Sequence, residues 1–115
     1  MEELLGIRPP DVLRGALQDI HWGLGLFGYF PTYALGNCYA AALAQAMERD
    51  LPLDQLISEG TFGPVLDWLR AKVHRRGCAV GTIALLEEST GAGLSAQPLL
   101  SYLEQKYTPL YGLAS

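Results

Sequence analysis

Apolar side chains recur at every third or fourth position along most of this chain, which is the spacing expected for one buried face of a helix. Proline and glycine interrupt the pattern and divide it into segments with helix start and stop signals. The segments predicted to be helical run from Asp11 to about Gly23, from Pro31 to Asp50, from Leu53 to Ile57, from Pro64 to a stop at Gly77, from Ile83 to Ser89, and from Ser95 onward. No run of alternating β-branched residues is long enough to compete with these signals. The pattern predicts an all-α chain.

Three of the predicted helices carry a clear apolar face. The faces comprise Leu35, Tyr39, Ala42, Leu43 and Ala46 in the second helix, Phe62, Val65, Leu66, Leu69 and Val73 around the helix that begins at Pro64, and Leu99, Leu100, Leu103, Tyr107 and Leu110 in the last helix. Thr82 and Ser95 are expected to cap the two final helices. The stretch from Tyr39 to Ala46 is rich in alanine, so we expect another helix to pack closely against it.

The length and composition are those of one small, rather apolar domain. The chain has 115 residues, of which 50% are hydrophobic and 17% are charged, and its mean hydropathy is +0.15. These values exclude intrinsic disorder and allow a single hydrophobic core. We therefore predict one helical domain over residues 1–115, with enough apolar surface to favour a partner.

The charge pattern argues against nucleic acid and membrane partners. The net charge is −4, and no aromatic ladder accompanies the basic cluster from Arg70 to Arg76, so no nucleic acid is expected. The stretch from Ile20 to Met47 has no charged side chain and is long enough to span a bilayer. Its histidine, proline, asparagine and glycine content is wrong for a membrane helix, so no membrane span is expected.

The first residues and the cysteines predict a cytoplasmic location. The opening sequence MEELLGIRPP is acidic and lacks the positive start of a signal peptide. Cys38 and Cys78 lie forty residues apart without a CxxC spacing, so we expect free thiols in a reducing compartment.

Two familiar patterns carry no chemistry in this sequence. The stretch from Gly23 to Gly28 matches the dinucleotide pattern GxGxxG, but the residues before it indicate a helix end, and the motif requires a strand there. His21 and His74, the only histidines, are far apart in sequence. Because zinc needs three or four ligands, no metal site is expected in this chain.

A histidine and two tyrosines form the most interesting constellation. Gln18, His21 and Trp22 fall at the spacing of one helical face, and Tyr29 and Tyr33 lie four residues apart at a helix start. Such donors could hold an oxyanion or a carboxylate. Alternatively, both tyrosines are core aromatics with satisfied hydroxyls. The spacing alone favours the core interpretation, and the composition does not decide the question.

At these residues the sequence resembles the Taq-type thermostable carboxypeptidases, a family of zinc metallopeptidases that remove single residues from peptide C-termini. The segment Gly15-Ala-Leu-Gln-Asp-Ile-His-Trp22 is similar to the family signature GxxQDxHW. The segment from Phe27 to Tyr33, with Leu-Gly-Asn after it, is similar to the next stretch of the family's sequence. The likeness covers nearly the whole chain.

The resemblance implies a helical C-terminal segment of a larger HExxH zinc metallopeptidase fold. In the family, zinc is held by the two histidines of HExxH and by a glutamate on a later helix, and none of these residues is in this chain. We therefore expect no cofactor in this chain and no activity of the chain alone. The resemblance assigns His21, Tyr29 and Tyr33 as catalytic residues that stabilise the oxyanion. Gln18 and Asp19 are assigned to the substrate or to orienting His21.

Two functions remain open at this point. In the first, the chain is the C-terminal portion of a zinc metallocarboxypeptidase that acts on peptide C-termini. In the second, it is a stand-alone helical module for interaction or dimerisation without catalysis. Both interpretations predict a homo-oligomer, with Trp22, Phe27, Phe30 or the apolar stripe around Leu35 partly in the contact.

Overall fold

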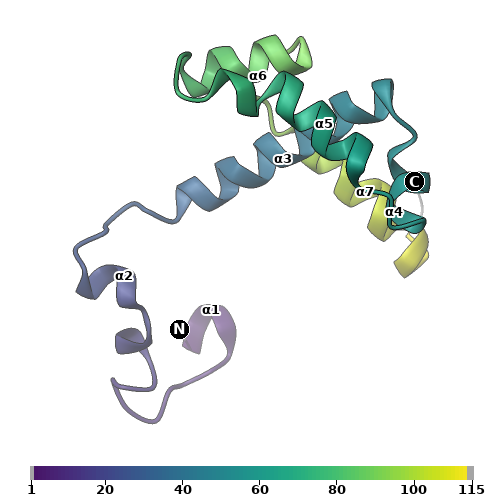
Figure 1. Ribbon diagram of the computed structural model, residues 1–115. Helices are drawn as coiled ribbons and strands as arrows, with labels where there is room; N and C mark the ends of the chain where they lie inside the picture. Colours follow the sequence, from purple (N-terminus) through teal and green to yellow (C-terminus); the bar gives the residue numbers. More distant parts are fainter. Residues whose placement is uncertain (1, 114–115) are drawn as a thin grey trace. The chain divides into compact units, whose positions relative to one another are not determined.

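The computed structural model describes residues 2–113, and all regular structure in this range is helical (Figure 1). The elements are α1 (Glu2–Leu5), η1 (Ala16–Gln18), α2 (Ile20–Gly23), α3 (Pro31–Asp50), α4 (Leu53–Ser58), α5 (Gly63–Lys72), η2 (His74–Arg76), α6 (Thr82–Thr90) and α7 (Gln97–Tyr111), where η marks a 3₁₀ helix. The described residues contain no strand. The predicted all-α class is confirmed.

The contacts within the chain define two compact units, one ending at Tyr33 and the other beginning at Ala34. The first unit contains α1, η1, α2 and the first residues of α3. The second unit contains the rest of α3 and the helices after it. A single domain over residues 1–115 stays a prediction.

The continuous helix predicted from Asp11 to Gly23 is wrong, because η1 ends at Gln18 and Asp19 caps the separate helix α2. The Arg14 N–H donates to Asp11 Oδ1 at 2.8 Å, and the His21 N–H donates to Asp19 Oδ1 at 2.8 Å. The Asp11 contact is that of a helix start, whereas Asp19 takes an N–H that a continuous helix would bond to the carbonyl four residues back. The segment therefore forms a turn, the short helix η1 and the single turn of α2. The four-residue helix α1 was not predicted.

Gly15 lets the chain fold back on itself before η1. A Cβ atom at this position would lie 3.0 Å from Pro9 Cγ and 3.4 Å from the Asp11 carbonyl oxygen. The Gly15 and Leu17 N–H groups both donate to the Val12 carbonyl at 3.2 Å. A glycine is therefore needed where the Pro9 ring approaches the backbone.

The core of the second unit is built on α3 and α5. Its buried members are Ala46, Met47 and Trp68, and the half-buried apolar side chains around them are Leu43, Leu51, Leu53, Val65 and Leu69. The apolar stripe predicted on α3 is confirmed over most of its length. Ala42 and Ala46 are buried, and Tyr39 and Leu43 are half-buried, whereas Leu35 remains 45% exposed.

The predicted apolar face of α5 is only partly correct. Val65 and Leu69 pack against the core, but Phe62 and Leu66 are 58% and 40% exposed. Trp68, which was not predicted to face inward, is buried. A large aromatic ring fills the space beside Met47 better than the smaller side chains of the predicted face.

Hydrogen bonds from side chains connect the helices of this unit. The Trp68 indole Nε1–H donates to Asp50 Oδ2 at 2.7 Å, which satisfies the only polar atom of the buried ring. Two further bonds link α3 to α6 and α6 to α5, with Arg49 donating to the Thr90 carbonyl and Ser89 donating to the Lys72 carbonyl. Each helix of the core is therefore held by packing and by a directional contact.

The predicted helix ends agree with the structure for α3 and for the start of α4, but α5 ends at Lys72, before the predicted stop at Gly77, and both predicted caps differ. Thr82 is the first residue of α6, and Gly81 takes the cap position without a side-chain bond. The Ser95 hydroxyl accepts the Gln97 N–H at 3.1 Å, but α7 begins at Gln97 and its cap position is Ala96, so Ser95 lies one residue before the cap. Gly91 ends α6 in a left-handed conformation, with φ of 78°.

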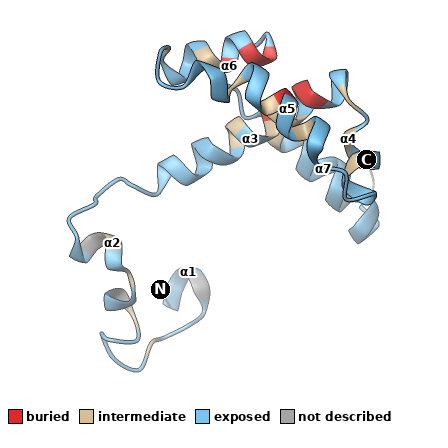
Figure 2. Cartoon of the chain, in the orientation of Figure 1, coloured by how far each residue is buried: buried red, intermediate tan, exposed pale blue. Residues whose placement is uncertain are grey.

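Many apolar side chains remain open to solvent. Figure 2 shows buried residues in α3, α5 and α6 of the described chain, and none in α7. On α7, Leu100 and Leu110 are 49% and 67% exposed, and in the first unit Leu13 and Ile20 are 67% and 69% exposed. Soluble monomers seldom leave so much large apolar surface uncovered.

Among residues 2–113, no helix is both long enough and apolar enough to cross a membrane.

We expect Met47→Ala to destabilise the second unit by about 2–5 kcal/mol, because it removes a buried side chain and leaves a cavity. Leu110→Ala is the control. It removes an exposed side chain from α7 and should change the free energy of unfolding by about 0.5 kcal/mol or less. Urea unfolding followed by circular dichroism measures both changes. Equal losses for the two variants would show that the cluster around Met47 is not the core.

Candidate functional site

The candidate site begins at Asp19, the residue before α2. Its Oδ1 accepts the His21 N–H at 2.8 Å, and His21 is the second residue of α2. This is the contact of a helix N-cap, which satisfies a backbone donor that has no partner inside the helix. The side chain of Asp19 thus starts the turn of helix that carries His21.

The same carboxylate oxygen also contacts the imidazole. Asp19 Oδ1 lies 2.9 Å from His21 Nδ1, and the two side chains are only 30% and 22% exposed. Partial burial would raise the pKa of the Asp19 carboxyl, but the hydrogen bonds and the nearby charge of His21 outweigh it and lower that pKa below its usual range. The carboxylate is therefore ionised at neutral pH and acts only as an acceptor.

Three aromatic rings surround the His21 imidazole. The Tyr29 ring stacks on it with centroids 5.4 Å apart, the Phe30 ring lies tilted at 4.9 Å, and the Tyr33 ring lies edge-on at 6.3 Å. The Tyr29 and Tyr33 rings also meet edge to face at 5.4 Å. The imidazole therefore has apolar ring surface on several sides and a carboxylate on one nitrogen.

A tight reversal of the chain brings these rings back to His21. Gly25 and Gly28 have φ values of 73° and 76°, a left-handed conformation that residues with a side chain adopt only under strain. The Thr32 hydroxyl then donates to the Tyr29 carbonyl at 2.6 Å, at the start of α3. Tyr33 comes next, in the first turn of that helix.

The Tyr33 hydroxyl lies on the opposite side of the imidazole from Asp19. Its oxygen is 3.4 Å from His21 Nε2, near the outer limit of a hydrogen bond. Partial burial, followed by its hydrogen-bonded neighbour Tyr29 and by the charge of Asp19, raises the pKa of the Tyr33 phenol. Tyr33 therefore keeps its proton at neutral pH and can donate it in a hydrogen bond.

The structure brings together four of the five predicted site residues, His21, Tyr29, Tyr33 and Asp19. Gln18 lies apart from them, because its side-chain Nε2 donates to the Leu13 carbonyl at 2.6 Å. The helical face that Gln18 was expected to share with His21 does not exist, since η1 and α2 are separate elements. The Trp22 side chain, expected on that face, lies outside the described residues.

Sequence reasoning missed Phe30 as a member of the site. The signal was present in the aromatic run Phe-Gly-Tyr-Phe-Pro-Thr-Tyr, in which four rings precede or begin a helix. Spacing alone could not show which of these rings would turn toward His21, because the reversal at Gly25 and Gly28 decides it.

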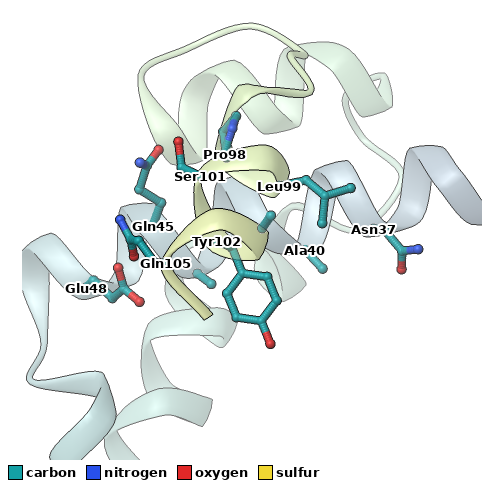
Figure 3. Close-up of a pocket in the computed structure, with 11 residues that line it drawn as sticks. Asn37, Ala40, Gln45, Glu48, Pro98, Leu99, Ser101, Tyr102 and Gln105 are labelled. Atoms are coloured by element: carbon teal, nitrogen blue, oxygen red, sulfur yellow. The ribbon is translucent and has the colours of Figure 1, made fainter. Parts of the chain in front are cut away.

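Away from this cluster, a hollow with a volume of about 440 Å³ lies between α3 and α7 (Figure 3). Its walls include Ala40, Leu99 and Tyr102, while Gln45 and Glu48 are at one end. The close helix packing expected along the alanine-rich stretch is therefore incomplete on this side. Glu48 and Tyr102 are the only lining residues of the described chain that titrate, so this hollow holds no cluster suited to catalysis.

A zinc site and a dinucleotide motif each require a specific arrangement of residues. Between residues 2 and 113, no three His, Cys, Asp or Glu side chains come close enough together to hold a metal ion. The GxGxxG match begins at the end of α2, a helix, so the strand that the dinucleotide motif requires is missing from this position.

Comparison with known proteins places the chain among carboxypeptidases. Residues 1–107 match the family described as Carboxypeptidase Taq (M32) metallopeptidase. Thermostable carboxypeptidase 1 of Thermus thermophilus is 50% identical over 109 residues, which are 94% of this chain and 21% of that protein. The match with Carboxypeptidase 1 of Bacillus subtilis is 45% identical and covers 96% of this chain and 22% of that protein.

Solved structures show the same relation. The crystal structure of BsuCP superimposes with a TM-score of 0.83 at 45% identity, covering 96% of this chain and 22% of that one. Metallocarboxypeptidase 1 of Trypanosoma cruzi gives a TM-score of 0.81 at 36% identity, covering 93% of this chain and 23% of that one. The chain therefore spans about a fifth of the length of the relatives that it matches.

The contact between Asp19 and His21 predicts an unusually acidic carboxyl group. The Asp19 side-chain carbon should titrate in an NMR experiment with a midpoint below about 3.9, the value for an unperturbed aspartate. The pKa of Asp19 is lower in the folded chain than in the unfolded chain. The contact therefore stabilises the fold at pH values above the pKa of the unfolded chain, and this stabilisation is lost as the pH falls through the pKa of the folded chain. In His21→Ala the midpoint should move upward. An unchanged midpoint would show that His21 does not lower the pKa of Asp19.

Proposed function

The chain belongs to the Carboxypeptidase Taq (M32) metallopeptidase family, and on this basis we propose that it supplies substrate-binding and transition-state-stabilising side chains to a zinc metallocarboxypeptidase. The reaction is the removal of single residues from peptide C-termini. The observation that carries the proposal is the placement of the Tyr33 hydroxyl 3.4 Å from His21 Nε2, beside the Tyr29 ring. Because the chain spans about a fifth of its relatives' length, it would provide one part of the active site.

These residues match the charge that develops during peptide hydrolysis. Attack of water on the scissile carbonyl places negative charge on its oxygen, and preorganised donors stabilise that charge. The Tyr29 and Tyr33 phenols would donate O–H groups to this oxygen, and His21 would donate from Nε2 when both ring nitrogens carry a proton. The raised pKa of Tyr33 supports this role, because the phenol stays protonated over the working range of pH.

Half-exposed rings are what a partly assembled substrate site requires. Tyr29, Phe30 and Tyr33 are 40%, 48% and 52% exposed, so their outer surfaces are open to a ligand. A site closed by substrate would exclude water and strengthen each hydrogen bond to the developing charge. The core-aromatic interpretation predicts buried rings instead.

Zinc supplies the Lewis acid in such an enzyme, but the described residues of this chain do not fit a zinc site. Zinc requires three or four ligands, and no group of three His, Cys, Asp or Glu side chains is assembled among residues 2–113. We assign to this chain the binding of substrate and of the oxyanion, and no step through the metal.

We also propose a cytoplasmic protein that self-associates. Cys38 and Cys78 are free thiols, which supports a reducing compartment. The exposed apolar side chains support association, and Leu35 on α3 is a member of the stripe that would lie in the contact. This property is shared with the alternative function, a helical interaction module without catalysis.

Kinetics in a complete carboxypeptidase that carries this segment tests the catalytic proposal. We expect Tyr33→Phe to lower kcat by about 10²–10³ with little change in KM, because the lost O–H acts mainly in the transition state. His21→Ala should have a comparable effect. Tyr111→Phe, in an exposed tyrosine outside the cluster, is the matched control and should leave kcat unchanged. Unchanged kcat with lowered stability in Tyr33→Phe would favour the core-aromatic interpretation.

Light scattering over a dilution series tests the association. We expect a dimer or larger assembly at micromolar concentration, because a two-fold pair buries the same apolar patch on both chains. Leu35→Glu should shift the equilibrium toward monomer, since it places a charge in the stripe. Leu110→Glu, at an exposed position of α7, is the control for a general effect of added charge. A folded monomer that binds no hydrophobic dye would contradict self-association.

A further inference from the structure

The side chain of Asp19 makes two contacts with His21, and a helix cap explains only one of them. Capping requires that a side-chain oxygen accept the N–H of the second or third residue of the helix, as Asp19 Oδ1 does for His21 at 2.8 Å. Serine and asparagine serve about as well as aspartate in that position. The second contact, from Oδ1 to the imidazole Nδ1 at 2.9 Å, is beyond what a cap needs.

A carboxylate beside one ring nitrogen decides where the imidazole carries its proton. An ionised carboxylate can only accept hydrogen bonds, so a contact of 2.9 Å requires a hydrogen on Nδ1. In the neutral ring only one nitrogen is protonated, and Nε2 is then left as an acceptor. Nε2 is the atom that lies 3.4 Å from the Tyr33 hydroxyl oxygen.

We propose that Asp19 is a positioning residue that keeps a proton on Nδ1 of His21. Nε2 is then the nitrogen that hydrogen-bonds to Tyr33 in the resting chain and to the substrate during the reaction. This inference rests on the function proposed for His21 and Tyr33. In the resting chain, Nε2 accepts from the Tyr33 hydroxyl. When the ring takes up a second proton, that proton is on Nε2, and Asp19 balances the positive charge from the other side of the ring.

The surroundings of the ring support a single orientation. The Tyr29 ring stacks on the imidazole at an interplanar angle of 23°, and the Phe30 ring lies tilted at 58°. With ring surfaces packed against it and Nδ1 bonded to Asp19, the imidazole has little freedom to flip. The two nitrogens are therefore not equivalent, and only Nε2 faces a phenol.

Asp19→Ser separates the cap from the control of the proton. Serine keeps an N-cap oxygen for the His21 N–H but is too short to hold the imidazole Nδ1, whereas Asp19→Ala removes both contacts. If Asp19 is only a cap, the His21 ring in Asp19→Ser behaves as in the original chain, and the ring in Asp19→Ala does not. If Asp19 controls the proton, Asp19→Ser and Asp19→Ala both move the hydrogen of the His21 ring away from Nδ1.

One-bond ¹H–¹⁵N couplings in the histidine rings of the full 115-residue chain show directly which ring nitrogen carries the hydrogen. At a pH where the ring is neutral, we expect the hydrogen of His21 on Nδ1 in the original chain and mainly on Nε2 in Asp19→Ser. His74, which is exposed, is the internal reference, and His74→Gln assigns its signals. A hydrogen that stays on Nδ1 in Asp19→Ser, or that is on Nε2 in the original chain, would overturn the inference.

A double-mutant comparison in a complete carboxypeptidase tests the route through His21. We expect Asp19→Ser to lower kcat at least tenfold with KM nearly unchanged, and to change kcat less than twofold in a His21→Ala background, because residues that act as a unit are not additive. Equal losses in the two backgrounds would refute action through His21. A moved proton with unchanged kcat would refute the positioning of Nε2 for catalysis, whereas an unchanged kcat in His21→Ala would refute the catalytic function proposed for His21.

Discussion

A single oxygen of the Asp19 carboxylate accepts both the backbone N–H and the imidazole Nδ1 of His21, and the local fold of the candidate site depends on this arrangement. The backbone contact ends the preceding segment and starts α2, so the chain does not continue as the long helix that its apolar spacing favours. The ring contact sets the direction of the imidazole. Local structure and site geometry thus have the same cause.

The aromatic surroundings of His21 depend on the reversal after α2. Two glycines in left-handed conformations, Gly25 and Gly28, allow the backbone to turn within a few residues. The start of α3 then returns Tyr29, Phe30 and Tyr33 to the imidazole. A β-branched or bulky residue at either glycine would strain the turn and separate the rings from His21.

The second unit is held by a small core. Met47 and Trp68 are buried between α3 and α5, and directional bonds such as that from Trp68 to Asp50 connect the helices. Many large apolar side chains outside this core remain open in the described residues. This exposed apolar surface is the reason for the proposed self-association, which would cover part of it.

The sequence by itself determined the helical class, the approximate extent of the main helices and the residue types of the candidate site. Helical periodicity is local, and proline, glycine and serine act within one turn, so α3, α5 and α7 could be predicted from neighbouring residues. The signature containing Gln18, Asp19 and His21 is also local, because its residues lie within eight positions of one another. It indicated the candidate site and the family of the chain.

Only the tertiary structure decided which of these residues meet. The break before α2 depends on the Asp19 side chain, which captures the His21 N–H, a competition that apolar spacing does not report. The burial of Trp68 and the approach of Phe30 to His21 depend on partners distant along the chain or beyond a turn. Periodicity describes one face of one helix, whereas packing selects among faces according to the space that other elements leave.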